Sequence, residues 1–221
     1  MQPIYVSKNL SAASSNGIGS ISTAATPVVT VNTSQLDTGR RIVFYSTADA
    51  SSMTLTFAGQ SEGLTAISES VVGSTASGIA ATTTLDFQSV TSVTASSNAN
   101  IPFIIGTSSV GGTPWKVTNW HISPMSLGGT ITFSTSANGM TARYDITMDD
   151  PSGAYPCPTH GSVPIVYNST SHIGVACSTD SWGVLNADAN TVVPITAWRL
   201  TLTSSSSGAG TVSGAVLQAG I

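Results

Sequence analysis

Apolar residues recur at every second position along most of this chain. Met53, Leu55 and Phe57 alternate with threonines, and five apolar residues between Met140 and Met148 share one side of an extended chain. The intervening Thr, Val and Ile residues are β-branched and suit a pleated, half-buried surface. No segment of useful length shows a helical period. The pattern therefore predicts an all-β protein.

The predicted strands are separated by turn residues such as Asp49, Gly63 and Gly111. They cover residues 42–45, 53–57, 64–72, 82–87, 90–95, 101–105, 115–120, 130–134, 140–148, 195–202 and 211–217. Their regular spacing, with short polar loops between them, is typical of a β-sandwich.

An internal repeat is predicted from two segments that align without a gap, residues 55–66 and residues 131–142, at an offset of 76 residues. The same offset places Phe44 over Trp120, Arg40 over Lys116 and Glu69 over Asp145. Each copy reads as a β-hairpin, with its turn at Gly63 or at Asn138-Gly139. Glycine suits such turns because they often require a positive φ.

The two halves also end alike, but there the offset has grown, so the second half carries an insertion of roughly 29 residues around 150–190. We therefore expect two tandem β-sandwich, jelly-roll-like units, the second with a long loop insertion. The expected domains are an N-terminal arm at 1–31, a first unit at 32–110 and a second unit at 111–221. A single larger sandwich built from both halves is the alternative.

The arm is rich in Ser, Ala and Gly between Ser7 and Val31, and Lys8 is the one charged residue of this stretch. It holds too few large residues to form a core of its own. One hypothesis makes it a strand-adding extension that docks on a partner, so that deleting residues 1–31 leaves the fold intact. The other makes it an edge strand of its own first domain.

Charge is scarce in this chain of 221 residues: 7% are charged and the formal net charge is −4. Polarity comes instead from 36 Ser and 31 Thr. The six basic residues are scattered, so we expect no nucleic-acid partner. No apolar run reaches the roughly 18 residues of a membrane span, and the N-terminus lacks a basic and apolar leader. We expect synthesis in the cytoplasm and no membrane partner.

Possible chemistry centres on the insertion, where Asp149-Asp150-Pro151 precedes His160 and His172. The spacing fits no metal-ligand pattern, and adjacent carboxylates on a strand point to opposite faces. A strand terminus in a turn is the better interpretation of this motif.

Cys157 and Cys177, with His160, supply too few ligands for a structural zinc site. A disulfide or two inert thiols remain open for the cysteines, and no orienting third group supports a Cys157–His160 nucleophile. We assign no catalytic, cofactor-binding or metal-binding residue and expect no enzymatic activity.

Four tryptophans are candidates for stacking on a carbohydrate. Trp120 and Trp198 lie in strands that repeat core strands of the first half, so we expect them in the core. Trp182 is expected near the surface. A glycan-binding module or adhesin that stacks sugars on Trp182 with Tyr155 or Tyr167 is therefore an alternative function.

A family resemblance runs through most of the chain. It rests on segments at 36–41, 55–57, 67–73, 83–94, 114–115, 149–151, 197–200 and 216–220, among them Leu36-Asp37-Thr38-Gly39-Arg40-Arg41 and Ala197-Trp198-Arg199-Leu200. These resemble virion structural proteins of tailed bacteriophages. The resemblance implies a non-enzymatic homo-oligomer of the virion that binds the major capsid protein or neck and tail proteins. It implies a capsid decoration or cement protein, or a neck or tail accessory protein.

Overall fold

The computed structural model describes residues 2–21, 28–29, 31, 35–96, 101–119, 126–133, 140–151, 161–165, 196–203 and 210–219. All regular elements among them are strands, which confirms the all-β class. The chain forms two compact units: unit 1 comprises Met1–Ala12 and Gly112–Ile221, and unit 2 comprises Ala13–Gly111. The chain passes from one unit to the other after Ala12 and again between Gly111 and Gly112.

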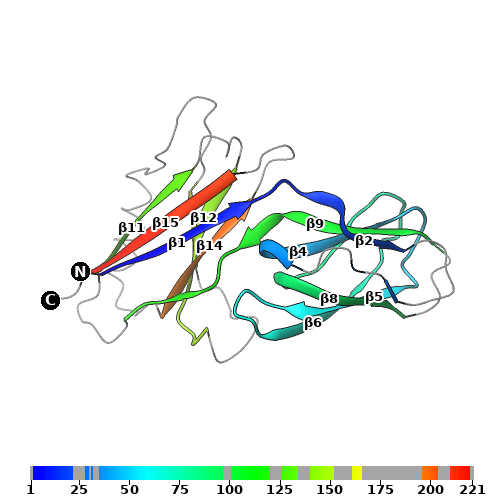
Figure 1. The fold of residues 1–221 in the computed structure, drawn as a ribbon, viewed down its shortest axis with the longest axis horizontal. Helices are drawn as coiled ribbons and strands as arrows, with labels where there is room; N and C mark the ends of the chain where they lie inside the picture. The colour runs from blue at the N-terminus through cyan, green and yellow to red at the C-terminus, as the bar shows by residue number, and fades with distance from the viewer. Residues whose placement is uncertain are drawn as a thin grey trace. The chain divides into compact units, whose positions relative to one another are not determined.

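Unit 2 is a curled antiparallel sheet with the strand order β9-β4-β8-β5-β6 (Figure 1). Three shorter strands extend it, because β2 pairs with β9, β3 pairs with β8 and β7 pairs with β4. The strands are β2 (Ser14–Ile21), β3 (Val28–Val29), β4 (Gln35–Ser46), β5 (Thr54–Gln60), β6 (Ala66–Val72), β7 (Ala81–Thr82), β8 (Phe87–Ala95) and β9 (Phe103–Gly112).

Four buried phenylalanines form the centre of the unit 2 core. Phe44 lies 5.8 Å from Phe57 and 6.0 Å from Phe103, ring centre to ring centre, and Phe57 lies 6.5 Å from Phe87. These aromatic pairs are tilted or edge-to-face, which is the favoured arrangement of aromatic rings. The alternation on β5 places Leu55 and Phe57 inward, as predicted, with the threonines on the other side.

The strand predicted over 82–87 is wrong, because β7 ends at Thr82 and β8 begins at Phe87. Side chains satisfy the backbone between them. The hydroxyl of Thr83 donates to the backbone carbonyl of Leu85, and Glu69 accepts from the backbone N–H groups of Thr84 and Leu85. With these groups already bonded, the segment does not need a neighbouring strand.

Unit 1 contains two sets of antiparallel strands, ordered β1-β15-β11 and β13-β12-β14, with β10 added to β14. In Figure 1, β15 runs between β1 and β11. The strands are β1 (Gln2–Leu10), β10 (Lys116–Val117), β11 (Ser126–Phe133), β12 (Thr141–Thr147), β13 (Gly161–Ile165), β14 (Ala197–Thr203) and β15 (Gly210–Ala219). Leu10, Tyr144, Trp198, Leu200 and Val212 are buried in this unit.

Gly214 marks the place where β15 packs closely on the strands β12 and β14. A Cβ atom at this position would lie 2.7 Å from Leu200 Cδ1 and 3.3 Å from the hydroxyl of Tyr144. Both neighbours are buried, so a shift of either side chain would have to take place inside the core. The two strand sets of unit 1 therefore face each other as the layers of a sandwich.

Replacing Gly214 by valine should destabilise unit 1 by about 2 kcal/mol, because it overfills a closely packed interface. All four tryptophans belong to unit 1, so tryptophan fluorescence in urea follows its unfolding. The expected result is a lower unfolding midpoint. An unchanged midpoint would show that β15 does not pack on Leu200.

The segment predicted as one N-terminal arm at 1–31 is divided between the two units. β1 pairs with β15 of unit 1 along its whole length, and β2 pairs with β9 of unit 2. Leu10 and Ile18 are fully buried. Deleting residues 1–31 would therefore remove core side chains from both units, and the expectation that this deletion leaves the fold intact is wrong.

The predicted internal repeat is not confirmed. Its first copy is a hairpin, since β5 pairs with β6. In the second copy, β11 pairs with β15, while β12 pairs with β13 and β14. Both edges of β12 are thus filled, and β11 belongs to the other strand set. The turn predicted at Asn138-Gly139 lies outside the described residues, as does most of the insertion at 150–190, of which β13 is described.

The period-two pattern over 140–148 is confirmed only in its first part. Met140, Ala142 and Tyr144 are buried, but Ile146 is half-buried and Met148 is 43% exposed. β12 ends at Thr147, so the pleat no longer fixes the direction of the Met148 side chain.

Candidate functional site

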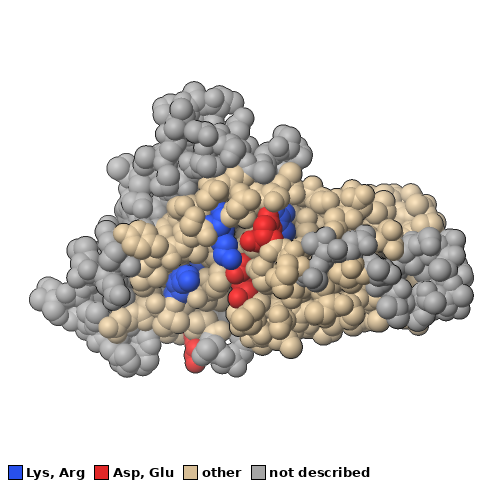
Figure 2. Space-filling view, viewed as in Figure 1, with Lys and Arg blue, Asp and Glu red and all other residues tan. Residues whose placement is uncertain are grey.

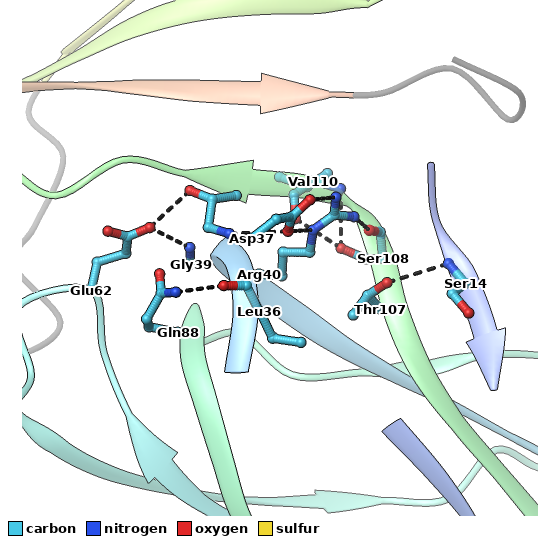
Figure 3. A network of polar contacts seen from close by, with 11 residues as sticks. Ser14, Leu36, Asp37, Gly39, Arg40, Glu62, Gln88, Thr107, Ser108 and Val110 are labelled. Carbon is cyan, nitrogen blue, oxygen red and sulfur yellow. Dashed lines mark hydrogen bonds and ion pairs between the residues drawn. The ribbon is translucent and has the colours of Figure 1, made fainter. Parts of the chain in front are cut away.

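Arg40 carries a buried positive charge in the middle of β4, and its side chain is only 1% exposed. Asp37 accepts two hydrogen bonds from the guanidinium, each 2.6 Å long, from Nε to Oδ1 and from Nη2 to Oδ2. Nη1 donates to the backbone carbonyl of Ser108 on β9 at 3.0 Å (Figure 3). The bidentate geometry within β4 is that of a strong ion pair. The hydrogen bond to Ser108 joins β4 to β9.

Glu62 ties the β5–β6 turn to the same region. Its Oε1 accepts from the hydroxyl of Thr38 at 2.9 Å and from the backbone N–H of Gly39 at 2.7 Å (Figure 3). Charge-assisted bonds of this kind are stronger than neutral ones. They fix the turn against β4.

The β5–β6 turn contains a conformational outlier. Leu64 has a φ of 60°, in the left-handed region that costs a non-glycine residue about 1 kcal/mol or more. The prediction that Gly63 supplies the positive φ of this turn is wrong, since Leu64 is the residue of the turn that adopts it. The backbone N–H of Leu64 bonds to the carbonyl of Ser61, and that of Ser61 bonds to the carbonyl of Thr65.

In unit 1, Asp145 is fully buried and binds two arginines. Its Oδ1 lies 2.8 Å from Arg143 Nε, and its Oδ2 lies 3.3 Å from Arg199 Nε. The hydroxyl of Thr201 donates to Oδ2 at 2.6 Å. The guanidinium of Arg199 also stacks on Trp115, 4.9 Å from the ring centre. The cluster joins β12 to β14, where Asp145 and Arg199 stand opposite each other.

Hydroxyls dominate the side of β6-β5-β8 that faces away from the unit 2 core. Thr56 stands between Ser70 and Thr94, and its hydroxyl lies 2.8 Å from that of Ser70. The neighbouring row places Ala58 between Ser68 and Ser92. In the view of Figure 2, charged side chains form a few small patches, and most of the described surface is uncharged.

Asp149 and Asp150 lie exposed just beyond the end of β12, where we expected a strand terminus. The hydroxyl of Thr196 donates to the carbonyl oxygen of Asp149 at 2.6 Å. His160, His172, Cys157 and Cys177 lie outside the described residues. Within the described ranges, no three His, Cys, Asp or Glu side chains gather as metal ligands would.

Asp49 occupies the turn predicted after β4. Its Oδ1 accepts from the backbone N–H of Ser51 at 2.9 Å. This backbone hydrogen bond, with a further one from the Ser51 side chain, lowers the pKa of Asp49 below its usual value. The group is fully exposed, so its role is to shape the turn.

Two of the four tryptophans belong to the described residues. Trp198 is 2% exposed and packs edge-to-face on Tyr144, which confirms its predicted core position. Trp115 is half-buried beside Arg199. Trp120, Trp182, Tyr155 and Tyr167 lie outside the described residues, so the stacking residues of the glycan-binding alternative carry no structural argument.

No prediction from the sequence named Arg40, Asp145 or Leu64 as a site. The spacing of Asp37 and Arg40 does not predict an ion pair, because residues three apart on a regular strand point to opposite faces. Arg143-x-Asp145 was a usable signal, because residues two apart share a face of a strand. A strained leucine next to a glycine has no sequence signal, since the glycine is the expected left-handed residue.

The part of the chain that the structure describes holds no helix with the length and hydropathy of a membrane span.

No protein-family model matches the chain, and no curated protein matches it significantly. A chain from the structure of infectious bursal disease virus, Gx strain, aligns with 98% of this chain and with 71% of its own length. The identity is 11% and the TM-score is 0.21, a likeness too remote to bear on fold or function. The function is therefore inferred from the residues themselves.

Proposed function

We propose that the protein is a non-enzymatic structural component of a tailed-phage virion. It oligomerises and binds other virion proteins, as a decoration or cement protein of the capsid or as a neck or tail accessory protein. The resemblance of segments such as Leu36 to Arg41 and Ala197 to Leu200 supports this proposal.

The observation that carries the proposal is that charged residues are scarce and that three of the arginines bind carboxylates within the protein. The guanidiniums of Arg40, Arg143 and Arg199 bind carboxylates of their own unit. The side of β6-β5-β8 that faces away from the core presents mainly hydroxyls and methyl groups. A surface with so little charge is a solubility hazard for a free protein, but it suits a protein whose final state is an assembly.

Immunogold labelling of purified particles, with an antibody raised against the chain, tests this proposal. We expect label on every particle, over the shell for a decoration protein or at one vertex or the tail for an accessory protein. Label found only in the soluble fraction of the lysate contradicts the proposal.

A further inference from the structure

The β5–β6 turn presents Leu64 to solvent on a strained backbone. The side chain is 72% exposed, which is the highest exposure among the large hydrophobic residues that the structure describes. Its φ of 60° is unfavourable for leucine. The residue therefore contributes little to the core while its backbone destabilises the unit.

The same turn would be less strained with glycine at its left-handed position, but the sequence does not place a glycine there. In hairpin loops with an i→i+3 turn followed by a left-handed residue, that residue is usually glycine. Gly63 stands one position earlier, where a Cβ atom would find no neighbour closer than 3.8 Å, so the space there does not require a glycine. Leucine thus occupies position 64, where glycine would be favoured, and glycine occupies position 63, which does not need it. This arrangement places a leucine at the tip of the turn.

The turn is also held rigidly. Glu62 binds Thr38 and Gly39 on β4, and the backbone bonds of Ser61 close the loop. Ser61 itself is buried. An apolar side chain on a fixed backbone loses little conformational freedom when it binds, which is the property of a preorganised anchor residue.

We propose that Leu64 is the apolar anchor by which the protein inserts into a pocket of another virion protein. This inference rests on the proposed function and names the contact residue. The Glu62 carboxylate lies in the same turn, so two copies meeting tip to tip would bring like charges together. This argues against a symmetric contact between two copies, and the partner we assign is a different virion protein whose apolar pocket is rimmed by basic or N–H groups.

Replacing Leu64 by asparagine separates the anchor role from a structural role, because the two effects have opposite signs. Asparagine tolerates the left-handed conformation, so the melting temperature should rise by about 2–4 °C. Binding to purified particles stripped of this protein, measured by co-sedimentation, should weaken at least about tenfold. Leu64→Met keeps the apolar anchor and should retain binding.

Ile79→Asn is the matched control, because Ile79 is an exposed apolar residue of unit 2 without a positive φ. It should leave binding unchanged. Equal binding of the wild-type chain and Leu64→Asn overturns the anchor proposal alone. Equal weakening by Ile79→Asn overturns it too, since the effect would then be general. Failure of the wild-type chain to bind particles overturns the proposed function and the anchor with it.

Discussion

Asp37→Asn should destabilise unit 2 by about 3 kcal/mol, because it leaves the buried Arg40 guanidinium without its carboxylate. The loss of one partner from a buried ion pair costs about 3–5 kcal/mol. We take the lower end because the Asp37 side chain is 22% exposed, so water can partly replace it. Urea unfolding followed by circular dichroism should show the lower midpoint, and hydrogen exchange should place the loss on β4 and β9.

Arg41→Gln is the matched control for this prediction. Arg41 is the neighbouring residue, its side chain is 42% exposed, and its Nε lies 3.7 Å from Asp86 Oδ1. The Asp86 side chain is 17% exposed, so the pair is partly open to water and should contribute about 1 kcal/mol. If Arg41→Gln and Asp37→Asn reduce stability equally, the buried ion pair has no special role.

Gly106→Ala should have the larger effect, about 4 kcal/mol, because it expels β2 from β9. A Cβ atom on Gly106 would collide with the backbone of Ser14 and Ser15, which cannot rotate away as a side chain can. The pairing of β2 with β9 shifts register between Ser14 and Gly19, so this crossing already follows an irregular path. Displacing β2 would also pull the buried Ile18 from the core. Urea unfolding measures this loss.

Gly63→Ala provides the control for the glycine substitution. Position 63 has open space around it, so we expect a change within about 0.5 kcal/mol. Hydrogen exchange of β2 adds a local readout, since its amides should exchange faster in Gly106→Ala and not in Gly63→Ala. Unchanged protection of β2 in Gly106→Ala would mean that the strands are not in close contact there.

The sequence pattern was sufficient to predict the all-β class and several core strands. Alternation is a local property, and it placed Leu55, Phe57 and Tyr144 inward because the pleat of a strand has a fixed period. The core position of Trp198 was also predicted correctly, although the internal repeat on which that prediction rested is not confirmed.

Strand pairing could not be predicted in the same way, because it depends on contacts between distant segments. β1 pairs with β15, whose residues lie two hundred or more positions later in the chain, and no local signal in Gln2–Leu10 specifies that partner. The Asn138-Gly139 signal favoured a local hairpin, yet β11 and β12 pair with other strands. The buried Arg40 was missed although Asp37 is three residues away, because side chains at that spacing leave a regular strand from opposite faces. Arg199 and Asp145 become neighbours only when β14 pairs with β12.

The copy number of this polypeptide in purified particles tests the central claim most directly. Quantitative mass spectrometry against the major shell subunit gives the ratio. We predict a fixed stoichiometry: near one to one or a simple lattice fraction for a decoration protein, or the count of a single ring for a neck or tail protein. Absence of the chain from the particles would contradict it.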